Sequence, residues 1–133
     1  MEARGFFERG DELTAAPRLR VGIGFGPDRV AGATALVDTG ADICVFPASL
    51  FPWPLPGTEA PDVTLTMGDG TTLDTTLRFP SITAGDIREI GVASAVLPGA
   101  TPILGRSFLN RLALRITAAQ GLVHLRTVSG HQP

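Results

Sequence analysis

Alternation of apolar and polar side chains is the dominant pattern along the chain. From residue 18 onward the positions expected to face a core are every second residue, namely Leu19, Val21, Ile23 and Phe25. This period of two is typical of a half-buried strand. Turn residues recur at short intervals, and no long segment has the 3.6-residue period of an amphipathic helix. The pattern therefore predicts an all-β protein built from hairpins.

The rest of the chain divides at clusters of glycine and proline. Residues 63–79 predict a hairpin whose tip is Gly68, Asp69 and Gly70, residues 82–97 predict a strand pair, and residues 113–127 predict a last hairpin. Prolines between residues 47 and 61 exclude a central strand there, because proline lacks the ladder N–H. The one convincing helix is short, from Phe108 to about Leu112, with Ser107 as its expected N-cap.

These elements predict one domain with two short extensions. Residues 1–16 carry mixed charges without sustained periodicity, so we expect an N-terminal arm that is disordered or packs on a partner. The domain is expected to span residues 17–128, and residues 129–133 form a polar tail.

Composition narrows the classes of function. The chain has 133 residues, of which 44% are hydrophobic, so a single ordinary core is feasible. A net charge of -2 argues against nucleic-acid binding, and no apolar run approaches the roughly 20 residues of a membrane span. Cys44 is the only cysteine, and no secretory signal is recognisable at the start. We therefore expect a cytoplasmic protein that uses neither a membrane nor a nucleic acid as partner.

Few residues are available for metal or cofactor chemistry. The chain has two histidines, His124 and His131, and no lysine, so histidine-based triads, zinc sites and Schiff-base chemistry lose support. A buried packing role suits Cys44 better than a nucleophilic one, because no histidine lies near it in sequence. We expect no cofactor and no metal.

Two segments carry a resemblance to a known family. Residues 36–42, with Asp38, Thr39 and Gly40 at their centre, resemble the active-site loop of retropepsin-like aspartic proteases. Residues 102–106, which end in Gly105 and Arg106, resemble that family's second motif and also precede a short helix. The resemblance implies a closed, barrel-like β domain with one short C-terminal helix, active as a homodimer.

The chemistry of this family needs two carboxyl groups. One carboxylate takes a proton from water while a neighbouring carboxylic acid supplies one, and two carboxyls in contact share a single proton. The chain has a single Asp-Thr-Gly sequence. The second carboxylate must then come from Asp38 of another copy, across a two-fold axis. The expected activity is hydrolysis of peptide bonds in a peptide or protein substrate.

The resemblance also assigns roles around Asp38. Thr39 would join the two active-site loops by a hydroxyl hydrogen bond, and Gly40 would let substrate approach the backbone. Asp42 and Arg106 would form an ion pair that supports the loop beside Gly105. The 63–79 hairpin would be a flap over the substrate. The residues expected to bind substrate are Ala41, Asp42, Met67, Gly68, Asp69 and Gly70.

Three alternatives remain at this point. The fold could serve a non-catalytic dimerisation or peptide-binding module, because the flap and the C-terminal hairpin depart from the retroviral pattern. Asp42 could be a second catalytic carboxylate within one chain. A metal-dependent hydrolase would use Asp38, Asp42 and Asp69, without support from histidine or glutamate.

Overall fold

The computed structural model describes residues 1–10, 13–55, 62–67 and 69–128. The strands are β1 Glu2–Glu8, β2 Ala16–Gly24, β3 Val30–Val37, β4 Cys44–Pro47, β5 Asp62–Thr66, β6 Thr72–Thr76, β7 Ser81–Ala84, β8 Ile87–Glu89, β9 Ser94–Leu97, β10 Ile103–Leu104, β11 Leu112–Thr117 and β12 Leu122–Thr127. The helix α1 spans Arg106–Leu109, and 3₁₀ turns span Ala48–Leu50 and Ala118–Gln120. The chain is all-β, as the alternating pattern predicts.

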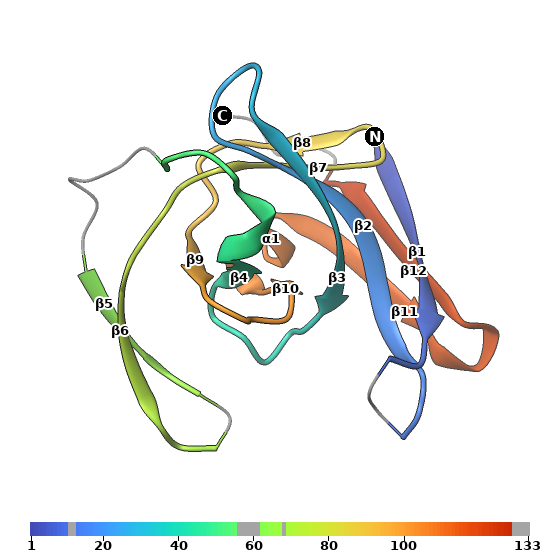
Figure 1. Ribbon diagram of the computed structural model, residues 1–133. Helices are drawn as coiled ribbons and strands as arrows, with labels where there is room; N and C mark the ends of the chain where they lie inside the picture. The colour runs from blue at the N-terminus through green and yellow to red at the C-terminus, as the bar shows by residue number, and fades with distance from the viewer. Residues whose placement is uncertain (11–12, 56–61, 68, 129–133) are drawn as a thin grey trace.

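Ten of the strands form one strongly curved sheet (Figure 1). Its strands follow the order β11-β12-β1-β2-β3-β10-β4-β9, and the β7–β8 hairpin pairs with β2. Most pairs are antiparallel, whereas β10 runs parallel to β3 and β9 runs parallel to β4. In the described part of the chain the end strands β11 and β9 do not pair with each other. The sheet is therefore open, which corrects the expected closed barrel.

The N-terminal strand β1 lies inside the sheet, between β12 and β2. Ala3 is 3% exposed, and a Cβ on Gly5 would collide with the carbonyl oxygen of Arg18. The expectation of a disordered arm is therefore wrong for residues 2–8. The reason is that the inward positions Ala3 and Gly5 are small, while the adjacent Phe6 and Phe7 interrupt the alternation, so the segment has no sustained period of two.

The core lies on the concave side of the curved sheet and under α1. The predicted inward residues Leu19, Val21 and Ile23 of β2 are buried. They belong to one cluster with the largest buried side chains of other elements, which include Phe46, Ile82, Ile87, Leu104 and Phe108. Burial of this apolar surface is the main source of the domain's stability.

The helix α1 begins earlier than the sequence predicts and is capped differently. Gly105 occupies the N-cap position, and no side chain caps the helix. The Ser107 hydroxyl instead donates to the Ala93 carbonyl at 2.7 Å and accepts the Cys44 N–H at 3.2 Å. Ser107 is therefore not the N-cap; its hydroxyl joins α1 to β4 and to the segment before β9.

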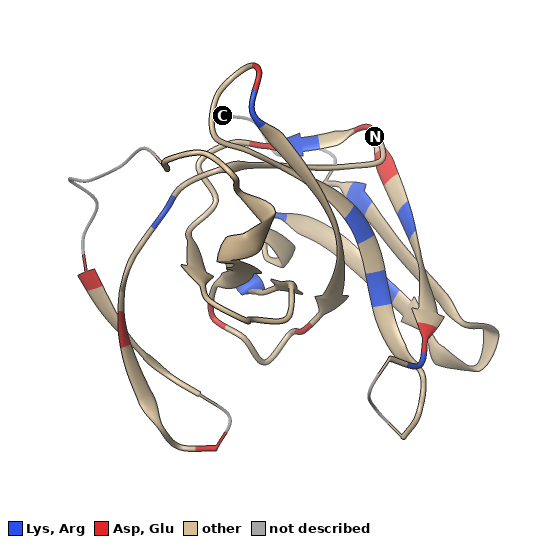
Figure 2. Ribbon diagram, in the orientation of Figure 1, with Lys and Arg blue, Asp and Glu red and all other residues tan. Residues whose placement is uncertain are grey.

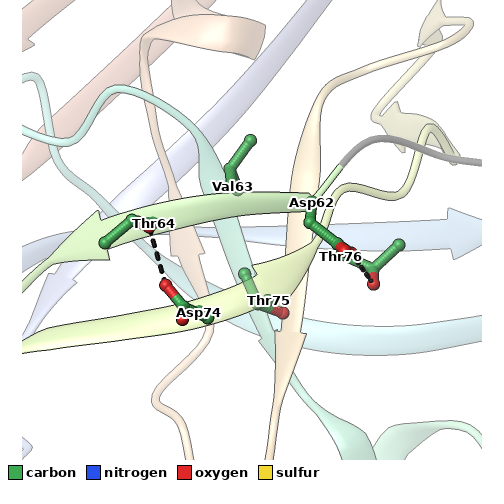
Figure 3. Close-up of a pocket in the computed structure, with 6 residues that line it drawn as sticks. All are labelled: Asp62, Val63, Thr64, Asp74, Thr75 and Thr76. Carbon is green, nitrogen blue, oxygen red and sulfur yellow. Dashed lines mark hydrogen bonds between the residues drawn. The ribbon is translucent and has the colours of Figure 1, made fainter.

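The β5–β6 hairpin forms a separate two-stranded sheet that extends away from the main sheet (Figure 1). Directly opposite residues on its two strands are hydrogen-bonded: Thr64 donates to Asp74 at 2.6 Å and Thr76 donates to Asp62 at 2.7 Å (Figure 3). Such cross-strand pairs stabilise an isolated hairpin. The hairpin expected at residues 63–79 is thus confirmed, while its tip residue Gly68 lies outside the described residues.

Candidate active site

The loop that carries Asp38 connects β3 to β4. Its start is fixed by β10, because the Asp38 N–H donates to the Leu104 carbonyl at 3.0 Å. The Asp38 carboxylate turns back on its own loop and accepts the Gly40 N–H at 2.9 Å. The Ala41 N–H donates to the Asp38 carbonyl at 3.3 Å. The loop is therefore a tight turn that leaves Asp38 half-buried with one carboxylate oxygen, Oδ1, in a defined place.

The segment around Gly105 passes directly behind this loop. A Cβ at residue 105 would collide with the Ile43 carbonyl oxygen and would lie 2.9 Å from that of Ala41. The Arg106 N–H donates to Ala41 at 2.8 Å, and the Ser107 N–H donates to Asp42 at 3.0 Å. Glycine is thus required at 105 by a close backbone approach, which agrees with the support that the resemblance assigns to it.

The side chains of Arg106 and Asp42 form the ion pair that the resemblance implies. The Arg106 guanidinium also donates to the Thr39 carbonyl at 3.2 Å. The side chains of Asp42 and Arg106 are 83% and 43% exposed, so solvent screening limits the pair to below about 1 kcal/mol of stability. Its main effect is positional, because one guanidinium joins both sides of the Asp38 loop.

The β5 strand of the hairpin and the Asp38 loop line a common cleft. Residues of the loop, β4, β5 and β10 contribute to this Asp38 cleft, which is lined by Asp38, Gly40, Ala41, Asp42, Ile43, Val45, Thr64, Leu65, Thr66, Met67 and Ile103. One side of β5 therefore faces the Asp38 loop across this cleft. The lining combines two carboxylates with a largely apolar wall.

Only some of the expected site residues line the Asp38 cleft. Asp38, Gly40, Ala41, Asp42 and Met67 line the cleft together. Thr39 is exposed beside the cleft, and Arg106 and Gly105 support the loop from behind. Asp69 and Gly70 are at the exposed hairpin tip and do not line the cleft.

Sequence reasoning missed the apolar wall of the cleft. Ile43, Val45, Leu65 and Ile103 line it, but Ile43 only precedes β4, and the other three belong to strands whose pattern indicates only which side is apolar. The wall arises where residues of β4, β5 and β10 meet. The available signal was the apolar run that follows Asp42 in the sequence.

At the hairpin tip the Asp69 carboxylate closes the turn. It accepts the Thr71 N–H at 2.9 Å and the Thr71 hydroxyl at 2.6 Å. These hydrogen bonds favour the ionised form and lower the pKa of Asp69 below its ordinary value. Gly70 follows with a φ of +88°, a conformation that favours glycine.

Other candidate groups do not gather into a site. Within the described ranges, no three side chains of His, Cys, Asp or Glu are arranged to hold a metal ion, so Asp38, Asp42 and Asp69 do not form the metal site of the hydrolase alternative. The pocket drawn in Figure 3 is lined by β5 and β6 alone, and its two carboxylates accept hydrogen bonds from threonines. Cys44 is fully buried, and burial raises the pKa of its thiol.

Among the comparisons with known proteins, a family profile matches the sequence of this chain. The sequence profile of a family described as retroviral aspartyl protease matches residues 14–117, which is most of the chain. A search of curated proteins finds no match.

Among the described residues, no helix has the length and apolar character needed to cross a membrane.

Proposed function

Because this chain belongs to the retroviral aspartyl protease family, we propose that it is an aspartic endopeptidase whose active site is shared by two copies of the chain. The observation that carries the proposal is the position of Asp38, on a tight loop that opens into a cleft lined on another side by β5 of the hairpin. One chain supplies one such carboxylate. A second copy related by a two-fold axis would supply the other.

In the proposed reaction the two Asp38 carboxyls hold one proton between them. The ionised carboxylate takes a proton from water as the water oxygen bonds to the peptide carbonyl carbon, and the protonated carboxyl gives its proton to the carbonyl oxygen. The tetrahedral intermediate then collapses: the C–N bond breaks, the leaving nitrogen takes up the proton of the protonated carboxyl, and a hydroxyl of the intermediate gives its proton to the other carboxylate, which restores the shared proton. The products are a carboxylic acid and an amine.

The neighbouring residues are assigned positioning roles in this scheme. The Gly40 N–H, which donates to the Asp38 carboxylate, would hold that carboxylate in place for the reaction. Arg106 and Asp42 would fix the loop on which Asp38 and Thr39 stand. The Thr39 side chain is exposed, which suits a hydrogen bond to a second copy.

We assign substrate binding to the Asp38 cleft. Its apolar wall of Ile43, Val45, Leu65 and Ile103 suits an apolar side chain of an extended peptide. The β5–β6 hairpin would close over that peptide as a flap. Met67, at the end of the cleft nearest the tip, would contact the substrate, whereas Asp69 and Gly70 would act through the conformation of the tip. No cofactor enters this reaction scheme.

The opposing candidate is a binding module without catalysis. It is favoured by one observation: β1 lies between β12 and β2, so both described ends of the chain are already paired within one copy. A dimer would then need another interface, and a monomer would have one Asp38 carboxylate without its partner.

We place the protein in the cytoplasm because its single cysteine suits a reducing compartment.

The deciding experiment compares the wild-type protein with Asp38→Asn on a diverse peptide library, with cleavage products identified by mass spectrometry from about pH 4 to 8. We expect cleavage by the wild type alone, since an amide keeps the shape of the carboxylate but cannot act as a base. Activity per subunit should also fall on dilution, because each site needs two chains. A folded wild type that cuts no peptide across this range would favour the binding module.

A further inference from the structure

Basic side chains gather on the convex, solvent-facing side of the strands near the chain ends. We define the basic face as Arg4 of β1, Arg20 of β2, Arg115 of β11, and His124 and Arg126 of β12. The four arginines are exposed. Figure 2 shows the basic segments of β1, β2 and β12 on one side of the molecule, while the β5–β6 hairpin on the other side carries acidic segments.

Strand register explains why these residues lie together. Arg115 is directly opposite His124, which is in turn directly opposite Arg4, so the three form a row across β11, β12 and β1. Residues opposite each other on adjacent strands point to the same side of a sheet, and neighbouring strands are about 4.8 Å apart. The row therefore brings three basic side chains within about 10 Å, although they are far apart in the sequence.

Few acidic groups offset this charge. Glu2 contacts His124 at 2.8 Å and Arg4 at 3.6 Å, and Glu8 is the other acidic residue on this side of β1. Among the described residues, Arg115 and Arg126 make no ion pair. Four arginines against two glutamates leave an excess of positive charge here, in a chain whose net charge is -2. An anionic ligand would offset this excess of positive charge.

The basic face also contains a hollow that is partly apolar. Leu122, which is 52% exposed, lines it together with Arg4, Arg115, Thr117, Gln120, Val123 and His124. Beside it, the guanidinium of Arg20 lies 5.9 Å from the centre of the Phe6 ring. Guanidinium, hydroxyl and amide donors around an apolar side chain match carboxylates that flank an apolar residue.

We propose that the basic face is an exosite that docks an acidic peptide segment containing an apolar residue, and so recruits protein substrates. The recruitment part rests on the proposed protease activity, whereas docking itself does not. A peptide fits better than a nucleic acid, because the described residues of this face present one phenyl ring, and Arg20 already covers it. Binding of a single strand relies on successive uncovered rings for base stacking.

Docking is tested on Asp38→Asn protein, so that binding is measured without cleavage. The probe is a short fluorescein-labelled peptide rich in Glu and Asp with one leucine, followed by fluorescence anisotropy. We expect saturable binding that weakens as salt is raised, because the attraction is electrostatic. Adding Arg115→Glu and Arg126→Glu should weaken binding at least about tenfold, since both cations become repulsive.

The matched control is Arg29→Glu with Arg88→Glu, which makes the same double charge change at two exposed residues outside the basic face. It should change binding less than about twofold. Equal losses in the control and the test variants would overturn the proposal, because they would show a response to net charge alone. Tighter binding of a single-stranded oligonucleotide than of the acidic peptide would also overturn it.

Recruitment is tested on the active enzyme. A cleavable peptide extended by an acidic segment should have a lower KM than the unextended peptide with a similar kcat, and Arg115→Glu with Arg126→Glu should remove that difference. An acidic segment that leaves KM unchanged would contradict recruitment. Absence of any cleavage would instead refute the protease activity, while the binding measurement on Asp38→Asn would still decide docking.

Discussion

At the scale of single residues, the shape of the Asp38 loop depends on glycine at position 105, which has no side chain. The backbone of residues 41–43 passes so close to Gly105 that no Cβ fits between them. This contact, together with the N–H groups of Arg106 and Ser107, gives the loop its shape. The exposed ion pair of Asp42 and Arg106 adds orientation and little stability.

Gly105→Ala should destabilise the protein by at least about 3 kcal/mol, because the methyl group collides with backbone atoms that cannot move without displacing the loop. Urea unfolding followed by circular dichroism measures the change. Gly32→Ala is the matched control: Gly32 is exposed in β3, and a Cβ there meets nothing within 4 Å. Similar stability of the two variants would show that the close approach behind the loop is not restrictive.

At the scale of elements, the β5–β6 hairpin is held mainly by its own hydrogen bonds. It forms a separate sheet, its cross-strand pairs join threonines to aspartates, and its tip is closed by Asp69. An element with few contacts to the core opens at low free-energy cost. This independence suits a flap, since closure over a substrate would not disturb the core.

The turn at the tip should respond to acid in a defined direction. Hydrogen bonds from the Thr71 hydroxyl and N–H lower the pKa of Asp69 below its ordinary 3.8. A pKa lowered by folding means that the stabilisation is complete above 3.8 and is lost as the pH falls through the lowered value. We therefore expect the tip to keep its structure throughout the range in which peptide cleavage is assayed.

An NMR titration of the Thr71 amide from about pH 2 to 6 measures this property. The Thr71 resonance of the wild type should titrate below 3.8, and in Asp69→Asn that transition should disappear, because an amide does not ionise in this range. A Thr71 transition centred above 3.8 would contradict the direction of the pKa shift.

At the scale of the whole molecule, the first and last strands among the described residues are paired within one sheet. β1 lies between β12 and β2, so the first strand of the chain bridges the last strand and the rest of the sheet. Residues 1 and 127 are also hydrogen-bonded, because the Thr127 N–H donates to the Met1 carbonyl at 3.0 Å. The N-terminal strand is therefore part of the fold.

Ala3→Asp tests that conclusion. Ala3 is buried in β1, so an unpaired carboxylate there should cost about 4 kcal/mol and lower the thermal midpoint markedly. Arg4→Gln changes the next residue, whose side chain is 76% exposed, and should cost less than about 1 kcal/mol. If Ala3→Asp unfolds at the wild-type temperature, residues 2–8 do not belong to the cooperative unit.

The local elements could be predicted from the sequence because their signals are local. Alternation identified the inward side of β2, glycine-bounded turns identified the hairpins, and two short motifs identified the Asp38 loop and Gly105. Two elements were missed or misplaced for physical reasons. The small residues Ala3 and Gly5 hide the strand β1, and the hydroxyl of Ser107 bonds to Ala93 and Cys44 instead of capping its helix.

The all-β class, the family and the residues of the Asp38 loop can be read from the amino-acid sequence alone, because each depends on neighbours along the chain. Three other features depend on strands that are distant in the sequence: the sheet stays open, Ile43, Leu65 and Ile103 line one cleft, and Arg4 joins the row of Arg115 and His124. These features depend on which strands become neighbours and in what register. That pairing is decided by the packing of the whole core, and no short segment encodes it.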